Sequence, residues 1–117
     1  MKMITLLLVG AITRYNGPIH APLKCGGTYN EGHRWIAMAD PRFQCGEWVI
    51  VQIDGYTPFV AQVKDSGGFA DHCVMQPDGS CAPIIGDLPT HAAPFAPDLS
   101  AIGSISHWRD DMPMLVP

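Results

Sequence analysis

The chain has 117 residues, the size of one ordinary domain and too short for two independent cores. Hydrophobic residues make up 47% of it and charged residues 15%, which excludes an intrinsically disordered chain. Seven Lys and Arg against eleven Asp and Glu give a net charge of −4. This charge argues against nucleic-acid and anionic-membrane partners, because both need a basic surface.

The N-terminal residues are apolar and begin M-K-M-I-T-L-L-L-V-G-A. A lysine followed by an apolar stretch is typical of an export signal, but this stretch is shorter than one. The apolar run over 4–12 is also about half the length that a bilayer requires, so we expect no membrane span. Residues 1–8 are therefore either a leader or an extra strand, with the domain at about 9–109 and a tail at 110–117.

Strand patterns recur along the rest of the chain, and twelve glycines and eleven prolines favour short strands with many turns. In 47–53 the residues Val49, Val51 and Ile53 alternate with a second face, and Asp54-Gly55 then forms a strong hairpin signal. Pro94 and Pro97 limit any helix near them. We expect strands at 12–15, 35–39, 47–53, 57–64 and 104–108, and one short helix within 88–96.

Long loops are expected at 16–34 and 70–86, between short strands. Loops of this length in a compact domain usually carry function. A small closed β-barrel would accommodate such strands, because closure removes the exposed edges of the sheet. The sequence therefore predicts an all-β fold with a single domain over 1–117.

The four cysteines stand at 25, 45, 73 and 81, and no two have C-x-x-C spacing. This makes a zinc ribbon or a thioredoxin-like site improbable, and we expect no metal. An even count in a small domain favours two disulfides and an oxidising compartment. We predict Cys25–Cys45 and Cys73–Cys81, the second closing a loop with a Pro-Asp-Gly turn; four buried free thiols are the alternative.

Four stretches in order carry a resemblance to one superfamily. They are V-G-A-I-T-R-Y-N-G (9–17), W-I-A-M-A-D-P-R (35–42), V-A-Q-V-K-D-S-G-G-F (60–69) and G-D-L-P-T-H-A (86–92). Together they resemble the double-psi β-barrel of rare lipoprotein A, of expansins and of the three-aspartate domain of membrane-bound lytic transglycosylase A. The resemblance implies a small six-stranded double-psi β-barrel with long loops and one short helix, and it covers nearly the whole chain.

The resemblance also marks two aspartates as catalytic candidates. Asp65 ends a predicted strand before two glycines, which let a ligand approach the backbone closely. Asp87 corresponds to the groove aspartate of expansins. Two carboxylates in one groove repel, so one pKa rises, and the resulting acid could protonate a glycosidic oxygen. Both aspartates would also suit turn capping, which is the alternative.

Asp98 offers a rival position, because Asp98-Leu99-Ser100 is a literal D-L-S segment. It leaves only ten residues before Trp108, too few for a turn, a reversal and a strand, whereas Asp87 leaves twenty-one. We therefore prefer Asp87. Two aromatic residues, Tyr15 and Trp108, are further candidates for substrate binding, because their rings could stack on sugar rings. Three residues of the resembled segments are also candidates: Asp40, Ser66 and Gly67.

The chain departs from the resembled families in ways that leave the activity open. The second domain of expansins and the second domain of the lytic transglycosylase are both missing from this sequence. The resemblance implies a barrel that acts on or binds cell-wall polysaccharide, with peptidoglycan expected and no cofactor. A non-catalytic expansin-like glycan-binding module, or a structural component of a virion or surface assembly, is the alternative. The expected location is extracytoplasmic: secreted, periplasmic, or on a cell surface or virion.

Overall fold

The computed structural model describes residues 6–15, 22–29, 34–66, 71–95 and 100–109. These residues form seven strands and no helix, and none of them belongs to a segment that could cross a bilayer as a helix. The strands are β1 (Leu7–Tyr15), β2 (Trp35–Met38), β3 (Trp48–Ile53), β4 (Phe59–Ser66), β5 (Cys73–Met75), β6 (Cys81–Pro89) and β7 (Ala101–His107).

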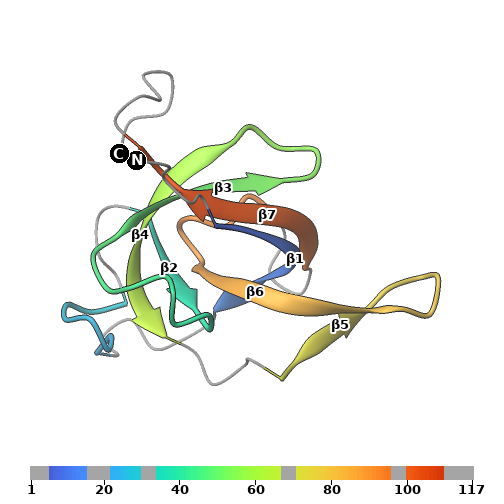
Figure 1. Ribbon diagram of the computed structural model, residues 1–117, viewed down its shortest axis with the longest axis horizontal. Coiled ribbons are helices and arrows are strands. Elements are labelled where there is room, and N and C mark those ends of the chain that lie inside the picture. Colours follow the sequence, from blue (N-terminus) through green and yellow to red (C-terminus); the bar gives the residue numbers. More distant parts are fainter. Residues whose placement is uncertain (1–5, 16–21, 30–33, 67–70, 96–99, 110–117) are drawn as a thin grey trace.

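Six of these strands close into a barrel, and β5 extends it as a hairpin with β6 (Figure 1). The order is β1-β7-β3-β4-β2-β6, and pairing between β1 and β6 closes the ring. The β1–β6 and β2–β4 pairs are parallel, and the other pairs are antiparallel. The predicted all-β fold with a closed six-stranded barrel is therefore confirmed.

The barrel interior is filled by one apolar cluster. In β3, Val49, Val51 and Ile53 are at most 1% exposed, whereas the alternate side chains reach the surface to varying degrees, as the alternation predicted. Burying one such aliphatic side chain contributes roughly 1.5–3 kcal/mol, so the cluster is the main source of stability. Its other members are Ile12, Ile36, Met38, Phe43, Phe59, Ala61, Val63, Ile85, Leu88, Ala92, Phe95 and Ile105.

A second, smaller cluster covers the outer face of β2. It consists of Leu23, Tyr29, Trp35 and Ala37, and Trp35 is completely buried. The indole N–H of Trp35 donates to the carbonyl oxygen of Tyr29 over 3.0 Å. Leu23 and Tyr29 belong to residues 22–29, which we call the strap because they pack over β2 from outside the barrel.

The predicted turn after β3 is confirmed. β3 and β4 pair antiparallel, and Gly55 between them has a φ of +87°, a conformation that residues with a side chain rarely adopt. Both predicted disulfides are also present. Cys25–Cys45 joins the strap to the turn before β3, and Cys73–Cys81 joins β5 to β6.

Two predictions about loops and helix are wrong. Residues 81–86, expected as loop, belong to β6, and β5 pairs with its first residues. The expected short helix within 88–96 is not present in the described residues. Leu88 and Pro89 instead remain in β6, paired with β1, and a single turn follows in which Ala92 and Ala93 donate to the Pro89 carbonyl oxygen. Pairing with β1 competes with helix formation, and a proline at 94 has no N–H to continue it.

The predicted start of the barrel can be compared with the observed start of β1. This strand begins at Leu7, so 7–8 already belong to the barrel and the first strand is longer than the predicted 12–15. Residues 1–5 and the predicted tail at 110–117 lie outside the described residues.

Candidate functional site

Four neighbouring strands bring Asp65 and Asp87 to the two sides of one alanine. Ala37 of β2 pairs with Asp65 of β4 on one edge and with Asp87 of β6 on the other. Asp87 also pairs with Thr13 of β1. Residues paired directly across strands project to the same face, so the four residues form a line on one face, which we call the aspartate row.

The aspartate row lies on the outside of the barrel. Ile12, Ile36 and Leu88 are the chain neighbours of row residues and point into the interior cluster. Because alternate strand residues face opposite ways, Thr13, Ala37 and Asp87 face outward. In β4 a register shift after Val63 brings Asp65 level with Ala37, on the same outer face. Ala37 itself lies beneath the strap, in the small outer cluster.

Asp87 is the residue of the aspartate row whose pKa is shifted. Its side chain is half-buried, and this burial raises the pKa of the carboxyl above its ordinary value, with a further rise from the negative charge of Asp65. The hydroxyl of Thr13 donates to Oδ1 of Asp87 over 2.8 Å and opposes the rise. Burial is the largest of the three effects, so Asp87 holds its proton to a higher pH than a free aspartate.

Asp65 is held by backbone donors. The N–H groups of Lys24 and Ser66 donate to its Oδ1 over 3.1 and 2.9 Å. These bonds orient the carboxylate and satisfy one of its oxygens. Ser66 is thereby placed at the exposed end of β4, beside the aspartate.

The strap crosses β2 between the two aspartates and is tied at both ends. On the Asp65 side, Cys25 N–H donates to the carbonyl oxygen of Lys64 over 3.0 Å, and the disulfide fixes Cys25 to Cys45. On the other side, the hydroxyl of Tyr29 accepts from the N–H of Thr90 over 2.9 Å and bonds its hydroxyl over 2.8 Å. The strap therefore forms a fixed cover over Ala37, the middle of the row, with one aspartate on each side.

The arrangement can donate and accept a proton. A half-buried carboxylic acid of raised pKa next to an oriented carboxylate is the pairing used in general acid–base catalysis on glycosides. The Thr13 hydroxyl also lies 3.5 Å from the Gly86 carbonyl oxygen. By rotating its hydrogen to that carbonyl, it could accept a bond from protonated Asp87, and it could donate to the ionised form.

Asp40 lies away from the row, in the turn after β2. Its carboxylate is paired with the Arg42 guanidinium, with contacts of 2.6–3.2 Å. The hydrogen bonds from Arg42 hold the pKa of Asp40 below its ordinary value. Asp40 thus caps a turn and forms an ion pair, and its proposed role in substrate binding stays a prediction.

The other predicted binding residues are spread over the molecule. Tyr15 ends β1, opposite Pro89. Trp108 follows β7, whose Ser106 pairs with Leu7, so Trp108 lies beyond the N-terminal end of β1. Along β1, Leu7 lies six positions from Thr13, or about 20 Å. On its other side, the Trp108 N–H donates to the carbonyl oxygen of Trp48, which pairs with Gln62 of β4, three residues before Asp65. The role of Trp108 in substrate binding stays a prediction. Gly67 and Asp98 lie outside the described residues.

Sequence reasoning missed three contributors to the site: the Thr13 hydroxyl, the Lys24 N–H and the Tyr29 hydroxyl. Thr13 stands in the first resembled stretch, at the threonine of the G-x-A-T-x-Y pattern, and that position could have identified it. The contributions of Lys24 and Tyr29 depend on how the strap folds back, and no local pattern indicates them.

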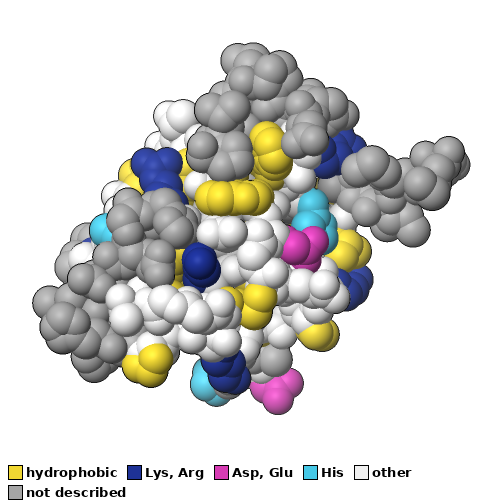
Figure 2. Space-filling view, turned by 90° about the vertical axis from the view of Figure 1, so that its left-hand side faces the viewer, with side chains coloured by type: hydrophobic (Ala, Val, Ile, Leu, Met, Phe, Trp, Pro, Cys, Tyr) yellow, Lys and Arg dark blue, Asp and Glu magenta, His cyan; other side chains and the backbone are white. Residues whose placement is uncertain are grey.

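Charged groups elsewhere form no comparable centre in the part of the chain that is described. There, no three His, Cys, Asp or Glu side chains gather as metal ligands. On the face in Figure 2, the coloured Lys and Arg side chains stand apart from one another and form no continuous basic patch. A cavity of about 520 Å³ opens in the wall of the barrel, but neither Asp65 nor Asp87 lines it.

No protein-family model, curated protein or solved structure matches this chain.

Proposed function

We propose that the barrel binds a cell-wall polysaccharide, with peptidoglycan as the expected glycan, along the aspartate row. The observation that carries the proposal is the pairing of half-buried Asp87, of raised pKa, with Asp65 across Ala37. The resemblance of four stretches to the double-psi barrels of glycan-active proteins supports it. The two disulfides favour an oxidising, extracytoplasmic compartment, where cell-wall polysaccharide is found.

In the catalytic form of the proposal, the reaction is that of a lytic transglycosylase. Protonated Asp87 gives its proton to the glycosidic oxygen as the bond from that oxygen to the sugar C1 breaks. The resulting carboxylate then takes the proton of the sugar 6-hydroxyl, whose oxygen bonds to C1 and forms a 1,6-anhydro product. The proton returns to Asp87, so the enzyme is regenerated and no water is consumed.

Asp65 supports this cycle through its charge. An ionised Asp65 raises the pKa of Asp87 and so favours its protonated form before the reaction. The same carboxylate would stabilise positive charge that develops on the sugar ring. The backbone bonds to its Oδ1 hold it in place for both roles.

A binding module without catalysis is the second candidate, and the position of the row favours it. The aspartates lie on the outer face of the barrel, outside the described cavity. A glycan would reach the two carboxylates on either side of the strap, which covers Ala37 between them. Under this reading Asp65 and Asp87 accept hydrogen bonds from sugar hydroxyls.

The test is the release of soluble 1,6-anhydro muropeptides from purified sacculi, measured by mass spectrometry. Asp87→Asn should reduce release about 10²- to 10⁴-fold, the usual contribution of a general acid. Asp98→Asn serves as the matched control and should release at the wild-type rate. Loss on Asp98→Asn with retention on Asp87→Asn would move the acid to the rival position.

Sedimentation with sacculi separates the two candidates. A wild-type protein that releases nothing, but sediments with sacculi and loses this on Asp65→Ala or Asp87→Ala, supports the binding module. A wild-type protein that neither cleaves nor sediments with sacculi overturns the proposed function. Thermal melts of every variant establish that it is folded.

A further inference from the structure

The cavity lies where β2 and β6 separate. The two strands pair at Ala37–Asp87 and at Met38–Gly86, and β2 then ends. Continued in the same register, they would place three further pairs opposite each other: Ala39 with Ile85, Asp40 with Ile84, and Pro41 with Pro83. All six of these residues line the cavity instead. The cavity is therefore the gap left by a strand pair that stops early.

Local chemistry explains why the pair stops. Pro41 and Pro83 have no backbone N–H, so neither can donate a ladder hydrogen bond to the other strand. The chain also turns at Asp40, whose carbonyl oxygen and Oδ1 accept from the N–H groups of Phe43 and Arg42 over 3.1 and 3.0 Å. Phe43 is then buried in the interior cluster. The turn is thus held away from β6, and the gap is part of the fold.

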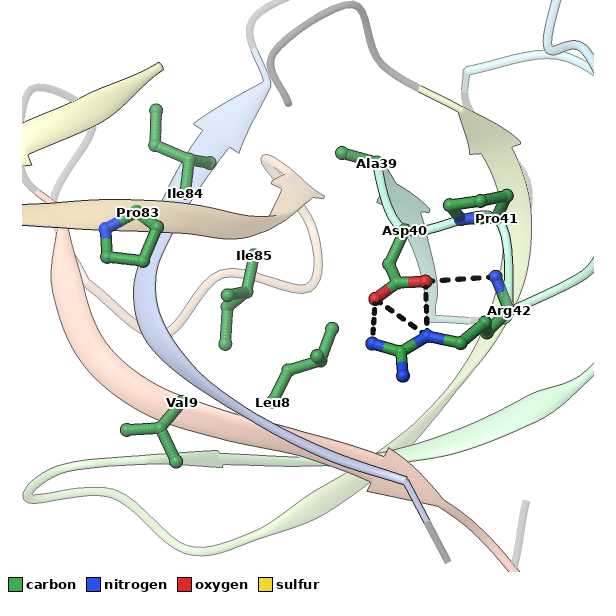
Figure 3. Close-up of a pocket in the computed structure, with 9 residues that line it drawn as sticks. All are labelled: Leu8, Val9, Ala39, Asp40, Pro41, Arg42, Pro83, Ile84 and Ile85. Carbon is green, nitrogen blue, oxygen red and sulfur yellow. Dashed lines mark hydrogen bonds and ion pairs between the residues drawn. The ribbon is translucent and has the colours of Figure 1, made fainter. Parts of the chain in front are cut away.

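One side of the cavity is apolar. Its volume is about 520 Å³, within the range of roughly 300–1,000 Å³ that small-molecule sites occupy. Leu8 of β1 and Ile85 of β6 point toward its middle from one side (Figure 3). Ile85 is 7% exposed and belongs to the interior cluster, against which Leu8 also packs. An occupant would therefore rest on the barrel core.

The ion pair of Asp40 and Arg42 lies on the opposite side of the cavity (Figure 3). Nε and Nη2 of Arg42 hold the Asp40 carboxylate, whereas Nη1 has no hydrogen-bond partner among the described residues. Because the two charges neutralise each other, neither a carboxylate nor an ammonium group gains a net attraction here. The N–H groups of Nη1 remain able to donate to an uncharged oxygen.

We propose that this cavity binds a small, uncharged aliphatic molecule that carries an oxygen acceptor, such as an alcohol or an ester. The aliphatic part contacts Leu8 and Ile85, and the oxygen accepts from Nη1 of Arg42. The proposal is independent of the glycan function, because neither Asp65 nor Asp87 lines the cavity.

Three six-carbon probes test the charge of the occupant: hexan-1-ol, hexanoate and hexylammonium. Each is titrated into the full chain at neutral pH, and binding is followed by the NMR shifts of the Ile and Leu methyl groups. Hexan-1-ol should shift the methyl groups of Leu8, Ile84 and Ile85 saturably, with a dissociation constant of about 1 mM or below. The two charged probes should bind at least about tenfold more weakly, because each would bury a charge without a partner.

Two variants should reverse this preference, because each leaves a single charge beside the cavity. Arg42→Gln leaves the Asp40 carboxylate alone, so hexylammonium should bind about tenfold better than hexan-1-ol. Asp40→Asn leaves the Arg42 guanidinium alone, so hexanoate should bind best, again by about tenfold. A purely structural ion pair would alter stability in these variants without reordering the three probes.

Val9 and Leu7 provide a matched pair of variants at the rim. Both side chains are 63% exposed on β1, but only Val9 lines the cavity. Val9→Asp should weaken hexan-1-ol binding about fivefold through lost apolar contact, and Leu7→Asp should leave it unchanged. Ala39→Phe fills part of the cavity and should weaken binding by more than about tenfold. Melting temperatures near that of the wild type would verify folding, and the rim pair decides the test if Ala39→Phe does not fold.

Three results would overturn the proposal. The first is the absence of a saturable methyl shift with hexan-1-ol in the wild type. The second is equal binding of the three probes, or shifts confined to methyl groups away from the cavity. The third is binding that is retained by a folded Ala39→Phe variant, or that Val9→Asp and Leu7→Asp weaken equally.

Discussion

The hydroxyl of Thr13 donates a 2.8 Å hydrogen bond to Oδ1 of Asp87, across the parallel pair that closes the barrel. Seventy-four residues separate the two in sequence. The bond lowers the pKa of Asp87, against the larger effect of burial. Thr13 thus limits how strongly the acid holds its proton.

Replacing Thr13 by Val should raise the pKa of Asp87 further, because it removes the one effect that lowers it. Above that pKa it should also cost about 1 kcal/mol of unfolding free energy, the value of a lost hydrogen bond. Titration of the Asp87 carboxyl carbon by NMR and denaturant unfolding measure the two effects. Thr13→Ser keeps the hydroxyl and should behave as the wild type; equal titration in all three proteins contradicts the assignment.

Asp87 should make the fold less stable as the pH rises. Its folded-state pKa is raised above the unfolded value of about 3.9, so its favourable contribution is complete below that value. The contribution is then lost as the pH rises through the folded-state pKa. Asp87→Asn lacks this loss, so its stability relative to the wild type should increase with pH in denaturant melts.

Asp40 provides a control of opposite sign for that experiment. Arg42 lowers the pKa of Asp40, so the stabilisation is present above the unfolded pKa and is lost as the pH falls through the folded one. Asp40→Asn should therefore lose stability relative to the wild type mainly at neutral pH. The loss should be small, since the pair is near the surface. Parallel pH profiles for the two variants would contradict the assignment of these shifts.

The two disulfides should differ in the segments that they hold in place. Removing Cys25–Cys45 with alanines should cost about 3.3 kcal/mol, and removing Cys73–Cys81 about 2.5 kcal/mol, from loop entropies over sequence separations of 20 and 8. Only the first bond ties the strap beside Asp65. Hydrogen exchange at the Lys24 amide should therefore accelerate in the first double variant and stay unchanged in the second.

A thiol titration of the denatured, unreduced wild type provides the baseline for that comparison. It should find no free thiol, because all four cysteines are bonded. Equal exchange at Lys24 in both double variants would show that the strap is held without the disulfide.

Two buried glycines of the barrel should respond differently to alanine. A Cβ on Gly103 would lie 2.3 Å from the backbone oxygen of Gln52, which cannot move without breaking strand pairing. A Cβ on Gly86 would instead meet the end atoms of Ile36 and Ile105 at 2.7 and 2.6 Å, and these can change rotamer. Gly103→Ala should cost about 3 kcal/mol and Gly86→Ala about 1 kcal/mol in denaturant unfolding. The reverse order would contradict this packing.

Local sequence patterns determined the elements whose causes are local. The alternation of Val49, Val51 and Ile53 established which face of β3 is buried, and Asp54-Gly55 established the hairpin to β4. The Pro-Asp-Gly turn between Cys73 and Cys81 indicated that these two cysteines pair. Each of these signals acts within a few residues, so periodicity and turn chemistry were sufficient to predict them.

The tertiary structure alone decided which residues meet at the site. The parallel pairing of β1 with β6 places Thr13 on Asp87, and β2 places Ala37 between the two aspartates. The strap brings the Lys24 amide to Asp65. These relations depend on the register of strands that are far apart in sequence. Because that register is set by barrel closure and packing of the whole core, no local pattern encodes it.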